Sequence, residues 1–194
     1  MTIKKKILKF TFLIVAVGLI FSLGYYYYLR STWNSFVTEK ELTEFVTKVK
    51  FAKELPERFY ELYEQEYPNI LTSSLNQQIG SGLFSKDFIK SPSLLAAMIS
   101  EYSRQDKDST RLSNKKAYVL AWKLEEQTTQ KECLNWVLEN YKFDLYIHGI
   151  NEVSNFYFKK AIFDLSDREL QDIIALMQKP SIVNVPDRSN EDLH

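Results

Sequence analysis

Few side chains in this 194-residue sequence are of the types that carry nucleophilic or metal chemistry. The single cysteine, Cys133, falls on an apolar position of a predicted helix, which favours a small core residue over a nucleophile. His148 has only the terminal His194 as a companion. The sequence contains no metal-ligand spacing, phosphate-binding loop or Ser-His-Asp set. We therefore expect no metal and no cofactor, and carboxylates and lysines are left as candidates.

Composition limits the class of protein that these residues can serve. Lys plus Arg equals Asp plus Glu at 25 each, so no charge excess favours a nucleic acid as partner. Apolar residues make up 45% of the chain, which can supply one membrane segment and one domain with a sizeable core. Aromatic residues are abundant at 14%, whereas glycine and proline are scarce, so a helical domain is expected.

The N-terminus resembles a membrane anchor. Four lysines among the first nine residues precede an uncharged run from Phe10 to Leu29, which is long enough to cross a hydrocarbon core of roughly 30 Å. Arg30 alone follows the run directly, so the positive-inside rule predicts a cytoplasmic N-terminus and an external domain. The tyrosine cluster 25–28 would lie at the outer interface, where an amphipathic ring is favoured.

A cleaved signal peptide is the alternative, because Ser22-Leu23-Gly24 offers small residues where a peptidase requires them. We favour the uncleaved anchor, because the apolar run continues through four tyrosines beyond that point. Residues 1–30 are then the cytoplasmic tip and transmembrane anchor, and residues 31–52 form an amphipathic helix or stalk. Such a helix could lie along the membrane or stand as a stalk, but packing against the domain is the interpretation that we favour.

The rest of the chain is predicted to be helical almost throughout, with no convincing strand pattern. Helices are expected over 38–52, 58–67, 94–102 after a Ser91 start, 130–140 after a Thr129 cap, and 167–178 after a Ser166–Glu169 capping box. Another long helix should run to Glu126 from a cap at Ser113 or Asn114. Residues 76–85, with two glycines, are predicted to be a flexible connection, and 104–110 a polar loop.

An ordered run of small signals lies in the C-terminal half, and its spacing is continuous from Ala117 to Asn184. It comprises Leu120-Ala121-Trp122-Lys123-Leu124-Glu125, Gln130-Lys131-Glu132-Cys133-Leu134, Phe143, Gly149-Ile150, Tyr157-Phe158-Lys159-Lys160, Leu165-Ser166, Glu169, Pro180 and Pro186. This run resembles the family 51 glycosyltransferase pattern L-A-x-x-L-E, K-x-E-I-L, F-G, G-I, Y-F-G-K, L-T-x-x-E and P-x-x-x-N-P. The resemblance implies an all-α chain, in which residues 53–188 form a lysozyme-like transglycosylase domain and 189–194 a flexible tail.

Members of that family polymerise the glycan strands of peptidoglycan from lipid II. The resemblance implies a glutamate in an R-K-x-x-E motif that assists the diphosphate donor. Counting back from Leu120 places Ala117 at that glutamate and Ser113-Asn114 at the basic pair. Lys115 and Lys116 lie within one helical turn and could partly restore the positive charge at a diphosphate; two solvated lysines are an equally good interpretation.

A second glutamate, in an E-D-x-x-F-x-x-H motif, deprotonates the acceptor hydroxyl in the family. Here Arg58-Phe59-Tyr60-Glu61 resembles the R-F-Y-E part of the family sequence, which puts Leu55-Pro56 at the acid pair and Leu62 at the histidine. Glu54 or Glu57 could supply the base only through a shift of register. Solvated surface glutamates are the alternative, and the one we favour.

The family motif G-S-T-I-T-Q-Q-L has two possible positions. Residues 73–79, Ser-Ser-Leu-Asn-Gln-Gln-Ile, have the better identities, whereas residues 91–98 have about the right spacing but lose both glutamines. The lysine that normally follows is replaced by Ser81 or Ser100. His148 stands where the family tends to have tyrosine, so an aromatic packing role is expected.

The matching positions are mostly those that packing requires, and the departing ones are those that catalysis requires. We therefore expect a degenerate relative of peptidoglycan glycosyltransferases in cell-wall biogenesis, without efficient catalysis, which binds lipid II, peptidoglycan or a wall-synthesis protein. It would be single-pass in the inner (cytoplasmic) membrane, with its domain on the extracytoplasmic side. The alternatives are an active lipid II glycosyltransferase with a displaced glutamate base, and a structural anchor or protein-interaction domain.

Overall fold

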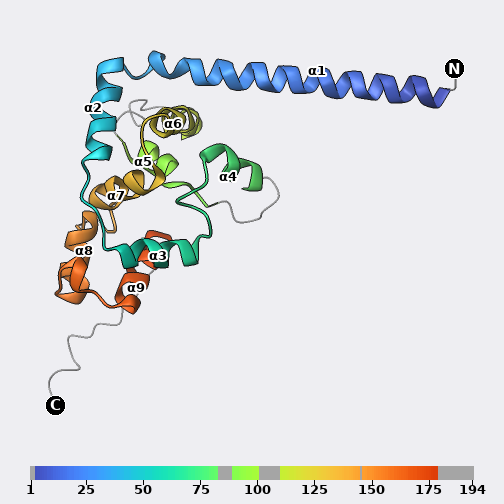
Figure 1. Cartoon of the computed structure of the whole chain (residues 1–194). Coiled ribbons are helices and arrows are strands. Elements are labelled where there is room, and N and C mark those ends of the chain that lie inside the picture. Colours follow the sequence, from blue (N-terminus) through green and yellow to red (C-terminus); the bar gives the residue numbers. More distant parts are fainter. Residues whose placement is uncertain (1–2, 83–88, 101–109, 145, 179–194) are drawn as a thin grey trace.

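The computed structural model describes residues 3–82, 89–100, 110–144 and 146–178 (Figure 1). Across these residues the chain is helical, and the one β interaction is an isolated bridge between Lys142 and His148. The elements are α1 (Ile3–Ser31), η1 (Thr32–Ser35), α2 (Glu39–Lys50), α3 (Glu57–Glu66), α4 (Leu75–Gly82), α5 (Pro92–Ile99), α6 (Thr110–Glu125), α7 (Gln130–Asn140), α8 (Gly149–Phe158), η3 (Ile162–Asp164) and α9 (Asp167–Gln178). The predicted all-α class is confirmed, and the helical domain is consistent with a lysozyme-like fold.

Helix α1 extends away from the domain that the other helices form (Figure 1). Within the described residues, the stretch Lys9–Ser35 is the one long and apolar enough to cross a membrane, and an 18-residue window inside it has a mean hydropathy of 1.8. Side chains from Phe10 to Leu23 are mostly exposed, because this part of α1 extends beyond the domain, whereas the end of the helix near Tyr26 contacts α6.

Helix α7 lies at the centre of the domain and separates two apolar cores. Cys133 and Val137, four residues apart, face the first core, which α2, α5 and α6 complete. Leu134 and Leu138 have the same spacing and face the second core, built with α3, α8 and α9. Residues four apart share one helix face, and the two pairs are offset by one residue, or about 100°, so α7 buries two adjacent faces in two different cores.

Several helix starts match the predicted caps. Thr129 and Glu132 form a reciprocal capping box at α7, and the Ser166 backbone N–H donates to Glu169 Oε2 at 2.7 Å at the start of α9. The Ser91 side chain accepts a hydrogen bond from the Leu94 N–H and caps α5. These local pairs satisfy backbone donors that the first helical turn leaves open.

Two predictions about helices were wrong. The expected flexible connection at 76–85 is helix α4 over Leu75–Gly82, because Leu75 is fully buried and the Gln77 side chain accepts the Ser74 N–H. Helix α6 begins at Thr110, so neither Ser113 nor Asn114 is its N-cap; no glycine or proline prevents the extra turn. Residues 101–109, which include most of the predicted polar loop, and the predicted tail lie outside the described residues.

Helix α2 does not stand apart as a stalk. Its apolar face, which contains Leu42, Phe45, Val46 and Val49, is buried in the first core, and the helix packs against α7. The Phe45 and Trp136 rings meet edge to face with centroids 4.9 Å apart. Residues 39–50 therefore belong to the folded domain.

Candidate functional site

Glu54 and Glu57, the candidate bases, lie at the surface where the chain enters α3. Both are exposed, and the Glu57 side chain is 74% exposed. Its carboxylate accepts a hydrogen bond from Lys131 Nζ at 3.0 Å. The Lys131 ammonium also lies 4.0 Å from the centroid of the Tyr60 ring. Glu57 thus has a structural partner from α7, as a solvated surface glutamate commonly does.

The residues that resemble R-F-Y-E join α3 to its neighbours. Arg58 holds Asp167 in a bidentate pair, with Nε and Nη2 at 3.0 and 2.6 Å from the two carboxylate oxygens. Phe59 is fully buried in the second core. The buried Tyr60 hydroxyl donates to Asn135 Oδ1 at 2.7 Å and accepts the Leu55 N–H at 2.9 Å. These contacts explain the residues of this motif by their structural role in joining α3 to α7 and α9.

Lys115 and Lys116, the candidate diphosphate ligands, lie on α6 at the end of the domain nearest α1. The Lys115 ammonium lies 5.8 Å from the Tyr25 ring centroid, and that of Lys116 lies 5.7 Å from Phe36. Ala117, which the resemblance places at the donor-side glutamate, is 1% exposed in the first core. The described α6 therefore presents two cations beside aromatic rings of the N-terminal segment, with an alanine at the glutamate position.

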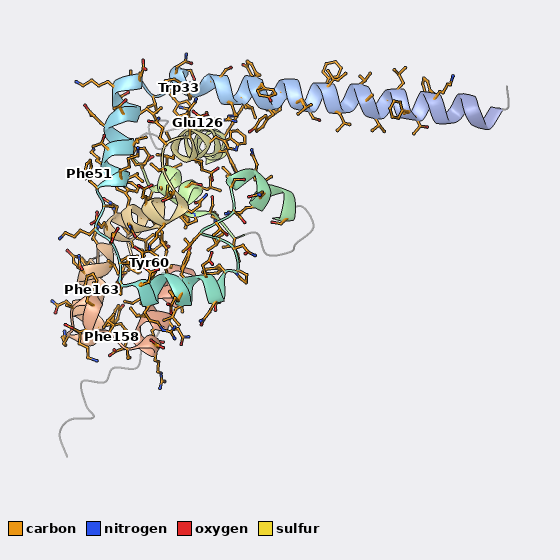
Figure 2. The ribbon with its side chains drawn as sticks, viewed as in Figure 1. Trp33, Phe51, Tyr60, Glu126, Phe158 and Phe163 are labelled. Atoms are coloured by element: carbon orange, nitrogen blue, oxygen red, sulfur yellow. The ribbon has the colours of Figure 1, made fainter. Side chains whose placement is uncertain are left out.

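The structure does not bring the candidate base and the candidate cations together. Helix α3 packs against α9, whereas α6 packs against α5, η1 and α1. Figure 2 shows Tyr60 of the α3 region and Glu126 at the end of α6 well apart on the domain. A base at Glu54 or Glu57 and a diphosphate at Lys115 would thus belong to different parts of the surface.

Glu125, the last residue of the L-A-x-x-L-E segment, is a polar centre that sequence reasoning did not identify. Its Oε1 atom accepts hydrogen bonds from the Leu75 N–H at 2.8 Å, the Ser93 hydroxyl at 2.8 Å and the Gln130 amide at 2.5 Å. Gln130 Oε1 in turn accepts the Ser93 N–H at 2.9 Å. A carboxylate beside the first turns of two helices is favourable, because those turns carry unpaired N–H groups.

Both possible positions of the G-S-T-I-T-Q-Q-L motif contribute a residue that donates to Glu125. Leu75 belongs to the first position, residues 73–79, and Ser93 to the second, residues 91–98. Gln78 donates to the Ile70 and Ser73 carbonyls at 3.3 and 3.1 Å, while its own Oε1 is buried without a hydrogen-bond partner in the described structure. The network links α4, α5, α6 and α7. The one feature of the sequence that could have indicated it is a glutamate at the end of a predicted helix.

A pocket of about 430 Å³ lies between α3 and α9, on the side of the second core. Its lining includes the buried side chains of Leu62 and Ile174 and the carboxylates of Glu66 and Asp172. Neither Glu54 nor Glu57 lines this pocket. No motif marks these four residues in the sequence, because their proximity depends on how α3 packs against α9.

Cys133 is a core residue, as predicted. It is fully buried, its sulfur lies 3.3 Å from the Thr128 hydroxyl, and burial raises the pKa of its thiol to about 12. The aromatic packing role predicted for His148 is wrong, because the His148 side chain is exposed. The backbone N–H of His148 donates a hydrogen bond to Glu152 Oε2 at 2.7 Å, at the start of α8. In the described ranges, no three His, Cys, Asp or Glu side chains gather in a way that could hold a metal ion.

Comparison with known proteins agrees with the helical scaffold. Residues 72–193 match the transglycosylase family, and this match covers more than half of the chain. The chain therefore belongs to the transglycosylase family. The matched segment begins after α3, so the R-F-Y-E residues and both candidate glutamates precede it. No curated protein and no solved structure matches the chain significantly.

Proposed function

We propose that this chain is a membrane-anchored member of the transglycosylase family that binds lipid-linked glycan in cell-wall biogenesis without efficient polymerisation. The family match supports a role like that of a peptidoglycan glycosyltransferase. The observation that carries the loss of catalysis is Ala117. Where the resemblance requires a glutamate, α6 has a methyl group buried in an apolar core, with no carboxylate to serve the donor.

The binding surface that we propose surrounds Lys115 in the first half of α6, beside α1. Lys115 is exposed there, and its ammonium lies beside Tyr25 at the outer end of the apolar run. A diphosphate on a polyprenyl chain carries its charge at that same depth, where a lysine is attracted to it. Lipid II or a growing glycan is the ligand class we propose, and a wall-synthesis protein is the alternative partner.

The anchor sets the location. The uncharged run supports a single span in the cytoplasmic membrane, and the lysines before it favour a cytoplasmic N-terminus with the domain on the extracytoplasmic side. Retention of the full chain in membranes after a high-salt wash, with protease access from outside, tests this arrangement. A soluble chain that begins at Tyr25 would support the cleaved signal peptide instead.

Polymerisation and binding of lipid II test the function separately. The purified chain should extend lipid II about 10²- to 10⁴-fold more slowly than an active family member, because a positioned base alone contributes that much. Rapid polymerisation that Glu54→Gln or Glu57→Gln abolishes would establish the enzyme with a displaced base. Rapid polymerisation by both variants would place the base elsewhere.

Binding should depend on the α6 lysines. Lys115→Ala with Lys116→Ala should weaken capture of lipid II in detergent micelles, whereas Lys48→Ala, an exposed lysine on α2, should leave it unchanged. The other outcome is that the parent, the double variant and the Lys48→Ala variant all fail to bind lipid II and isolated glycan although the parent is folded and membrane-bound. That result would replace glycan binding by the protein-interaction alternative.

A further inference from the structure

The pocket between α3 and α9 lies beside an ion pair that holds the two helices together. Near the start of both helices, Arg58 holds Asp167 through two hydrogen bonds of 3.0 and 2.6 Å. The pocket opens about one to two turns further along the same helices and has a volume of about 430 Å³. Ligand pockets typically measure about 300–1,000 Å³, so this one is large enough for a whole side chain rather than a single ion.

The lining combines apolar side chains with groups that accept hydrogen bonds. Leu62 and Ile174 are 3% and 4% exposed, and Ala175 follows on α9. The polar lining consists of two amides and two carboxylates, from Gln65, Glu66, Gln171 and Asp172. No lysine, arginine or histidine is among the described residues that line the pocket. A ligand that fits this lining has an apolar stem and a group that donates hydrogen bonds.

The electrostatics of the pocket favour a positive charge on that group. Asp172 forms no ion pair with another residue in the described part of the chain. The pocket also lies at the C-terminal end of α3, and the last turn of this helix contains no basic residue. The last carbonyl groups of a helix and its macrodipole attract cations. Near the start of α3 the situation differs, because Arg58 pairs with both Asp167 and Glu61.

We infer that this pocket binds a lysine side chain of a partner protein. The alkyl stem lies against Leu62 and Ile174, and the ammonium donates to Asp172, because a lysine buries its stem while its charged end keeps polar partners. The amides of Gln65 on α3 and Gln171 on α9 provide further acceptors from two sides.

The arrangement of these acceptors favours lysine over arginine. An ammonium has three donors that point in different directions, which suits acceptors from two helices. The planar fork of an arginine suits a single carboxylate, as the Arg58–Asp167 pair shows one turn away. Figure 1 shows α3 and α9 at the end of the domain opposite α1, so this site is separate from the glycan surface proposed at Lys115.

Titration of the full chain in non-ionic detergent micelles with two short peptides tests the inference. The first is acetyl-Gly-Lys-Gly-amide, and the second has norleucine, which keeps the alkyl stem and lacks the ammonium, in place of lysine. Nuclear magnetic resonance follows the side-chain amide signals of Gln65 and Gln171. The lysine peptide should shift both signals saturably, with an affinity that falls as salt is added, and the norleucine peptide should not.

Variants identify the groups that recognise the lysine peptide. Asp172→Asn should weaken binding about three- to tenfold, whereas Asp164→Asn, an exposed carboxylate on η3 that does not line the pocket, should leave it unchanged. Ala175→Phe places a ring at the exposed edge of the pocket and should block binding. Circular dichroism checks that each variant is folded.

Three results would overturn the inference. They are no saturable shift in the parent, equal binding of the lysine and norleucine peptides, and unchanged binding by folded Asp172→Asn and Ala175→Phe. A peptide with arginine at the central position should bind more weakly than the lysine peptide, and tighter binding would refute the assignment to lysine.

Discussion

Replacing Gly149 by alanine should destabilise the domain strongly. Gly149 has φ of +76°, and a Cβ atom there would lie 2.6 Å from the Glu139 carbonyl oxygen. The left-handed conformation costs a residue with a side chain about 1–2 kcal/mol. Relief of the clash must move backbone, which also disturbs the 2.8 Å hydrogen bond from the Gly149 N–H to the Tyr141 carbonyl, worth about 1 kcal/mol.

Together these costs predict a loss of about 2–3 kcal/mol in the free energy of unfolding. For a chain of this size each kcal/mol lowers Tm by about 2–4 °C, so the melting temperature should fall by about 4–12 °C. Far-ultraviolet circular dichroism of the detergent-solubilised protein during heating measures the change.

Gly80→Ala is the matched control, because the same methyl group would meet nothing within 4 Å on α4. It should be neutral or stabilise the chain by about 0.5–1 kcal/mol, since alanine is the better helix former. If Gly149→Ala and Gly80→Ala melt at the same temperature as the parent, the close approach of α8 to the end of α7 is wrong.

Three further predictions concern single side chains. Glu125→Ala should lower the free energy of unfolding by about 2–4 kcal/mol in urea titrations, because three donors lose their shared acceptor; a loss below 1 kcal/mol would contradict this. The Cys133 thiol should resist alkylation at pH 8 in the folded protein and react at once in urea, because burial raises its pKa to about 12. Burial alone would raise the pKa of Glu169, but hydrogen bonds from Lys160 and Ser166 lower it to about 2, so its contribution is full above the unfolded value of about 4.5 and is lost as pH falls from there toward 2. Glu169→Gln should flatten that acid limb of the stability curve, and an unchanged limb would argue against the pairing.

Local signals predicted much of the fold. The cap at Thr129 and the capping box at Ser166 are patterns of residues three apart, so they depend on no distant contact. Helix α4 was not predicted, because it depends on a contact with a residue that is distant in the sequence. Its glycines and polar residues resemble a linker, and its first turn is stabilised by Glu125, which lies fifty residues further along the chain. Propensity cannot register a partner at that distance.

The candidate site shows the same limit. Lys115 and Lys116 were identified by spacing, but the rings beside them belong to residues 25 and 36, far away in the sequence. Glu57 could supply a base only through a shift of register, and its pairing with Lys131 of α7 likewise depends on packing that the sequence does not show. Composition and motif give the type of a side chain, whereas its partner depends on the packing of α1 and α7 against the domain.

Helix α6 shows how a family scaffold can persist while the chemistry changes. Glu125, at its end, is held by three donors from other helices, so its charge is compensated and it stabilises the fold. Ala117, two turns earlier, faces an apolar core in which an ionised carboxylate would be expensive to bury. The fold therefore stabilises a glutamate at position 125, whereas at position 117 it offers no hydrogen-bond donor to a carboxylate and surrounds it with apolar side chains. The positions that resemble the family are therefore those the fold itself requires, and the position that departs is one that only a reaction would require.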